Sequence, residues 1–190
     1  MSTADSGAPN WPLRILSELD AAARRAESVA AALSPSQLNW QPRQGAWSVG
    51  QCLDHLRAGN KIMAPVLSSA LEGRPHRPVE EITPGWFGGW FIRTFIAPNP
   101  GGTRTKAPKK IEPAILVEPV ILENYLRSTE AARVVVRQAS KYDVNHIRYK
   151  NPFLPLLRFT VGEGLEIIAK HQGRHLLQAE AVRQSAGFPR

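Results

Sequence analysis

The 190-residue sequence is poor in cysteine and in long apolar runs, and both absences limit what the protein can be. Cys52 is the single cysteine, which excludes an intramolecular disulfide and fits a reducing compartment. Nothing approaches the roughly 18 consecutive apolar residues of a membrane-spanning helix. Residues 1–10 are small and polar and lack the apolar core of a signal peptide. We therefore expect a soluble, cytoplasmic protein with no membrane partner.

Acidic residues are outnumbered by basic ones, with 16 Asp and Glu against 24 Lys and Arg, for a formal net charge of +8. Such a surplus can attract nucleic acid or an anionic substrate. The densest basic cluster, Arg104 to Lys110, lies in a segment rich in proline and glycine and is offset from the aromatic cluster. A nucleic-acid reader would interleave the two. The sequence thus favours a solvated basic surface, with any nucleic-acid binding non-specific and weakened by salt.

Helical periodicity dominates the chain. Apolar residues recur every three or four positions in four segments, at about residues 11–33, 48–71, 119–142 and 160–186. No strand alternation is found. The pattern predicts an all-α four-helix bundle in which residues 11–190 form one domain, preceded by a disordered tail at residues 1–10.

Three capping boxes mark helix starts in this sequence. A Ser or Thr is followed three residues later by Gln or Glu at Ser34, Ser48 and Thr160. In this arrangement the two side chains satisfy backbone N–H groups that the first helical turn leaves free. The boxes predict a short helix after Ser34 and firm starts for the second and last long helices.

The connection between the second and third helices, residues 73–116, is long enough to cross the bundle, so those helices need not be antiparallel. Its centre, around residues 86–96, is rich in aromatic residues and is expected to form a helical turn or two. The cluster favours a cover over the core. The alternative is a substrate pocket, whose lining residues would be Trp86, Trp90 and Phe91.

Histidines give the strongest chemical signal. His171 and His175 stand four residues apart on the last helix, which stacks their imidazoles on one face about 6 Å apart along the axis. His55 lies on an inward face of the second helix. Three histidine ligands leave a coordination position open, as in catalytic zinc sites. The alternative is that each histidine pairs separately with a carboxylate, from Glu163, Glu166 or Asp54.

Other residues are placed to support such a site. Gln51 lies one turn before His55, and Arg174 and Gln178 flank His175, so these three side chains are expected to orient the histidines. Competing chemistries lack their motifs: no His-Glu-x-x-His, paired Glu-x-x-His or phosphate-binding loop occurs. Cys52 is expected to be a buried core residue rather than an activated thiol.

Two stretches of the chain resemble the motifs of the DinB-like superfamily. Leu33–Trp40 with Gly45–Leu56 resembles the first motif, and Asn151–Phe153 with His171–Gln178 resembles the second. The likeness covers most of residues 11–185, with Gly173 standing where a better helix former is expected. The resemblance implies a bundle of up-down-down-up order, often a homodimer; despite the superfamily's name, it does not imply DNA binding. It also implies a divalent metal, zinc or nickel, held by His55, His171 and His175.

The superfamily resemblance further implies either thiol transfer or hydrolysis. Neither motif supplies a carboxylate where a hydrolytic base would need it, and no further catalytic residue is predicted. The interpretation is therefore a metal-dependent enzyme that activates a low-molecular-weight thiol for transfer to a small electrophilic substrate. The alternatives are a metal-dependent hydrolase and a non-catalytic, metal-stabilised bundle that binds a small ligand.

Overall fold

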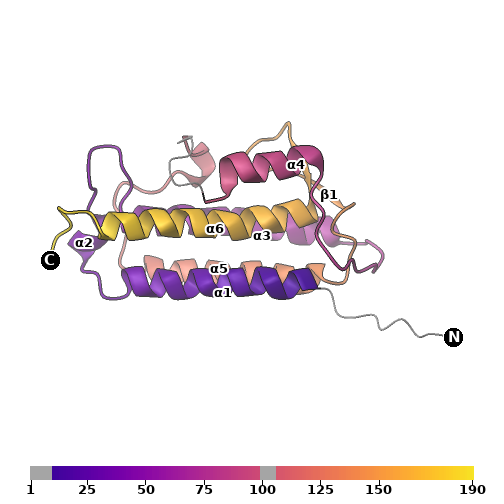
Figure 1. Ribbon diagram of the computed structural model, residues 1–190, viewed down its shortest axis with the longest axis horizontal. Helices are drawn as coiled ribbons and strands as arrows, with labels where there is room; N and C mark the ends of the chain where they lie inside the picture. Colours follow the sequence, from indigo (N-terminus) through magenta and orange to yellow (C-terminus); the bar gives the residue numbers. More distant parts are fainter. Residues whose placement is uncertain (1–9, 99–105) are drawn as a thin grey trace.

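Four long helices build the molecule in the computed structural model, which describes residues 10–98 and 106–190. They are α1 (Asn10–Ala30), α3 (Val49–Leu71), α5 (Ile121–Ala139) and α6 (Val161–Arg183). The predicted all-α four-helix bundle is confirmed (Figure 1). Of the tail predicted at residues 1–10, all but Asn10 lies outside the described residues, and Asn10 is the first residue of α1.

The helices run in up-down-down-up order. In Figure 1, α1 and α6 run toward the left end of the bundle, whereas α3 and α5 run toward the right end. α3 packs against α5 and α6, and α1 packs against the same two helices. Because the neighbours α3 and α5 are parallel, the chain between them must return along the whole bundle. The connection from residue 72 to residue 120 makes this crossover.

The predicted capping boxes start three helices. Ser34 caps the short α2 (Pro35–Asn39), Ser48 caps α3 and Thr160 caps α6. In each box the cap oxygen accepts from the backbone N–H three residues on, and the Gln or Glu side chain bonds back to the cap N–H. These local bonds fix where the helices that carry the histidines begin.

A small antiparallel hairpin, β1 (Arg148–Lys150) paired with β2 (Arg158–Thr160), corrects the expectation that the chain has no strand. Strands of three residues are too short to show an alternating pattern in the sequence. Tyr149 lies opposite Phe159, and both side chains are buried. The hairpin leads directly into α6, because β2 ends at Thr160 and α6 begins at Val161.

The long connection carries α4 (Trp86–Phe91), one π-helical turn η1 (Ile92–Ile96) and the 3₁₀ turn η2 (Lys109–Ile111). α4 and η1 lie along α6 (Figure 1). Glu163 fastens the start of α4, because its Oε1 accepts from the Gly85 N–H at 2.9 Å while its Oε2 accepts from Thr160 N at 2.7 Å. Within the described part of the chain, none of the helices has the length and apolar character required to cross a membrane.

Two adjacent glycines in α4 offer a test of how this segment is held. A Cβ on Gly88 would lie 1.9 Å from Glu163 Oε1, whereas a Cβ on Gly89 would meet the tip of Arg93 at 3.2 Å and Pro84 at an ordinary contact distance of 3.7 Å. Since Glu163 is fixed by two backbone amides, we expect Gly88→Ala to destabilise the fold by about 1–3 kcal/mol. Gly89→Ala should be neutral or stabilise by up to about 1 kcal/mol through helix propensity. Urea denaturation measures the free energy of unfolding of both variants. Equal values would contradict the prediction that Glu163 restricts the space at Gly88.

Candidate metal centre

Three histidines from two helices converge inside the bundle. His55 comes from α3, and His171 and His175 come from α6. Ring nitrogens from the three side chains all lie within 4.8 Å of one another. The ring centroids are 4.5–4.8 Å apart, and each pair of rings meets edge to face. Because one ring nitrogen from each histidine lies this close to the other two, the three side chains could share one metal ion.

The distance between His55 and His171 fits a shared cation. Their Nε2 atoms face each other at 3.0 Å. Two imidazole nitrogens bound tetrahedrally to one zinc ion at about 2.0–2.1 Å lie roughly 3.3 Å apart. His55 is only 2% exposed, whereas His171 is partly exposed, so the cluster reaches solvent on one side.

In two of the three rings, a hydrogen bond occupies Nδ1 and leaves Nε2 available to a metal ion. His55 Nδ1 donates to the buried carbonyl of Ile111 at 2.6 Å, and His175 Nδ1 donates to Gln178 Oε1 at 3.0 Å. Since a neutral imidazole carries one proton, each Nδ1–H donor leaves a lone pair on its Nε2. A carbonyl or amide oxygen behind the ring is the usual support of a metal-binding histidine.

Burial keeps the three imidazoles neutral. It lowers the pKa of His55, although the Ile111 carbonyl and Asp54 oppose this effect. Burial, reinforced by His175, His55 and Arg174, brings the pKa of His171 well below its usual value. For His175, burial and the neighbouring His55 lower the pKa to about 3. At neutral pH all three rings are therefore in the form that binds metals.

The carboxylates that were the alternative partners of the histidines bond elsewhere. Glu163 caps α6 and holds Gly85, as described above. Glu166 pairs with Arg14. Asp54 accepts from Arg57 at 2.8 Å through one oxygen and from the Ala114 N–H at 3.0 Å through the other. The histidines thus meet one another rather than separate acidic partners.

Gln51, expected to orient His55, bonds to the crossover segment instead. Its Nε2 donates to the carbonyl of Ala114 at 3.0 Å, and its Oε1 accepts from Gln41 and from the Ser48 N–H. Asp54 holds the same segment through the Ala114 N–H. Because this segment also supplies the Ile111 carbonyl, Gln51 and Asp54 act on His55 through the backbone at residues 111–114.

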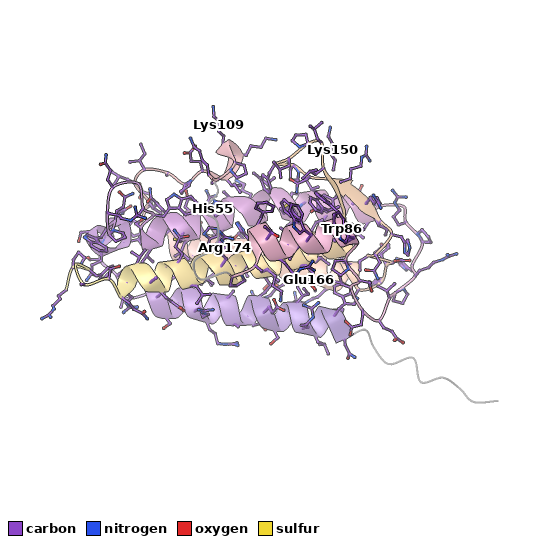
Figure 2. The ribbon with its side chains drawn as sticks, turned by 45° about the horizontal axis from the view of Figure 1, so that its top comes forward. His55, Trp86, Lys109, Lys150, Glu166 and Arg174 are labelled. Carbon is purple, nitrogen blue, oxygen red and sulfur yellow. The ribbon has the colours of Figure 1, made fainter. Side chains whose placement is uncertain are left out.

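Arg174 and Gln178 lie on the same stripe of α6 as the two histidines. Gln178 accepts from His175, as given above. The Arg174 guanidinium donates to the carbonyl of Phe95 at 2.8 Å, at the end of η1. Figure 2 shows Arg174 beside His55, with Lys109 of η2 on the outer side. The histidine cluster therefore has a positive charge at its edge.

Trp47 contacts the cluster, and the sequence analysis did not assign it to the site. Its ring centroid lies 4.7 Å from that of His55 and 5.4 Å from that of His175. Trp47 precedes the capping residue Ser48, and this position was the available signal, because a residue just before an N-cap packs back over the first turns of its helix. Trp47 therefore forms an aromatic wall of the histidine cluster.

The three residues predicted to line a substrate pocket make no ring contact with the histidines in the described part of the chain. Trp86 is 85% exposed and Trp90 is 41% exposed. Phe91 packs on Phe159, with centroids 5.1 Å apart. This aromatic group covers the start of α6 near Glu163, and the eight residues from Glu163 to His171 span about 12 Å of helix. Figure 2 shows Trp86 displaced along the bundle from His55.

Fold and site together define a helical bundle with a three-histidine cluster suited to a divalent metal. The sequence matches the family model of the DinB superfamily over residues 18–179, and the chain belongs to that superfamily. It is similar to the uncharacterized protein YuaE of Bacillus subtilis (strain 168), with 21% identity over 159 residues that cover 80% of this chain and 86% of that protein. No solved structure matches the chain significantly.

Proposed function

We propose that His55, His171 and His175 bind one divalent ion, zinc or nickel, and that the protein activates a low-molecular-weight thiol for transfer to a small electrophile. The convergence of three neutral imidazoles, with no carboxylate joining them among the described residues, carries this proposal. Three protein ligands leave a coordination position for an exogenous group. A bound cation would lower the pKa of a coordinated thiol, which removes the need for a dedicated base.

Charge around the cluster favours an anionic thiol. Neutral ligands leave the charge of a divalent ion uncompensated, and Arg174 adds a positive charge on the same stripe of α6. Lys109 and Lys110 stand on η2, next to the Ile111 carbonyl that holds His55. The nearest acidic group on α3, Asp54, is already paired with Arg57. A thiol that carries a carboxylate therefore suits the site better than a cationic thiol.

Hydrolysis is the weaker candidate. A metal-dependent hydrolase needs a carboxylate or water chain that moves protons beside the ion. Glu163 and Glu166 bond to the α4 start and to Arg14, respectively. The partly buried Trp47 gives the cluster an apolar wall, which would pack against the electrophilic substrate in place of Trp86, Trp90 and Phe91.

Thiol titration of the cobalt-substituted protein tests the reaction class. We expect thioglycolate to produce a thiolate-to-cobalt charge-transfer band, with tighter binding than neutral 2-mercaptoethanol and much tighter binding than cationic 2-mercaptoethylamine. Removing the positive charge in Arg174→Gln should reduce the preference for thioglycolate by about tenfold, since one nearby charge contributes about 1–2 kcal/mol. The preference is measured as a ratio of Kd values, which cancels any general loss of cobalt affinity.

A different result would separate the two reaction classes. If no thiol changes the cobalt spectrum while small esters or amides are hydrolysed, the thiol-transfer proposal is wrong and the hydrolase alternative stands. Lys61→Gln is a suitable control for Arg174→Gln, because Lys61 is an exposed cation on α3 that makes the same change in net charge. It should leave the ratio of thiol affinities unchanged.

A further inference from the structure

A buried polar layer crosses the bundle at the level of the histidines. It contains Asn60 on α3, Thr129 on α5 and Gln172 on α6, each at most 3% exposed. Two separate apolar clusters form the core, and on all three helices one cluster ends before the layer and the other begins after it. Burying a layer of polar side chains in an apolar core costs free energy unless those side chains are hydrogen-bonded. The position of this layer beside the histidines therefore suggests a role for it.

Hydrogen bonds join the layer into one chain across three helices. The Tyr125 hydroxyl on α5 donates to Gln172 Oε1 at 2.8 Å, and Gln172 Nε2 donates to Asn60 Oδ1 at 2.8 Å. Asn60 Nδ2 in turn donates to Ser128 Oγ at 3.2 Å and to Thr129 Oγ1 at 3.5 Å. Each of the two side-chain amides both donates and accepts hydrogen bonds, so only one orientation of each amide satisfies the chain. A fully satisfied network of this kind is rigid and directional.

The layer is adjacent to the metal centre on both helices that carry ligands. Gln172 follows His171 directly in α6. On α3, Asn60 follows Gly59, where a Cβ would lie 4.0 Å from His171 Nδ1. The Gln172–Asn60 bond therefore joins α3 to α6 at the level at which His55 meets His171.

We propose that the Tyr125–Gln172–Asn60 chain is a positioning device that fixes the register of α6 against α3 and so sets the separation of His55 from His171 and His175. Apolar packing alone tolerates small axial slips, whereas directional polar bonds specify one alignment. One residue of slip moves a helix by about 1.5 Å, while metal–ligand distances tolerate only about 0.2 Å. This inference rests on the proposed metal binding.

Two buried tyrosines provide a matched test. Tyr125→Phe removes the hydroxyl that anchors Gln172, while Tyr149→Phe removes a buried hydroxyl for which no hydrogen-bond partner is present among the described residues. We expect Tyr125→Phe to weaken zinc and cobalt binding by at least about tenfold, as for other supports of metal ligands, and to alter the cobalt absorption spectrum. Tyr149→Phe should keep the wild-type Kd and spectrum.

The readouts separate positioning from stability. At a temperature where the metal-free protein is fully folded, a fall in stability alone leaves the metal Kd unchanged. Gln172→Met, which keeps the side-chain length but removes both bonds, serves as a second variant and should bind metal more weakly than Tyr125→Phe. Wild-type affinity and spectrum in both variants would overturn the positioning role. Absence of metal binding by the wild-type protein would instead overturn the proposed function, and this inference with it.

Discussion

We expect His175→Ala to abolish the proposed metal binding and, with it, the stability that a bound metal would confer. Losing one of three ligands should raise the metal Kd by at least about a thousandfold, or roughly 4 kcal/mol. Wild-type protein at a free metal concentration of about 1,000 times its Kd gains about 4 kcal/mol of stability by linkage, and the variant gains almost none. Metal content of protein purified without a histidine tag, and melting temperature with and without added metal, measure the two effects.

His146→Ala is the control for this experiment. His146 is 85% exposed and bonds to Asp143, so its removal should leave metal content at one ion per chain. His55→Ala and His171→Ala should reproduce the loss seen for His175→Ala, because all three imidazoles meet at one point. Full metal occupancy in His175→Ala would show that this histidine is not a ligand.

Local sequence signals were sufficient to predict the helices and the two faces that carry the histidines. A capping box spans four residues, and Ser48 with Gln51 starts α3 where the sequence predicted. The spacing of His171 and His175 is likewise a property of one helix. Their convergence with His55 could be predicted because inward faces of neighbouring helices share a core, although periodicity alone does not determine the register between helices.

The backbone carbonyl that bonds His55 comes from the irregular connection between α3 and α5. The sequence carries no periodic signal for the path of such a connection. Ile111 is 56 residues from His55 and bonds to it only because the crossover passes over α3. The same segment explains why Gln51 bonds to Ala114 rather than to His55. The position of Trp86 could not be predicted for a related reason: the aromatic pattern indicated packing, but not where along α6 the segment would lie.

Metal-free protein should lose stability as the pH falls below about 6.5. Each of the three histidines has a lower pKa in the folded protein than in the unfolded chain. Between the two values the unfolded state binds protons that the folded state excludes, so stability is complete above the unfolded pKa of about 6.5 and falls on acidification. For His175, with a folded pKa of about 3, this loss is about 2 kcal/mol at pH 5.

His55 and His171 change stability in the same direction, because burial lowers the pKa of each in the folded protein. Urea denaturation of the metal-free protein between pH 5 and 7.5 gives the free energy of unfolding as a function of pH. The slope of this dependence should decrease in His175→Gln, which removes one titrating group of the cluster. It should be unchanged in His146→Gln, which removes an exposed histidine. In the folded protein, protons compete with a bound ion for the ring nitrogens only near the lowered pKa values, so release of the ion by protonation is expected below this pH range rather than within it. Unchanged stability from pH 7.5 to pH 5 would mean that the imidazoles accept protons in the folded state, and the cluster would then not be held in the neutral form that a metal needs.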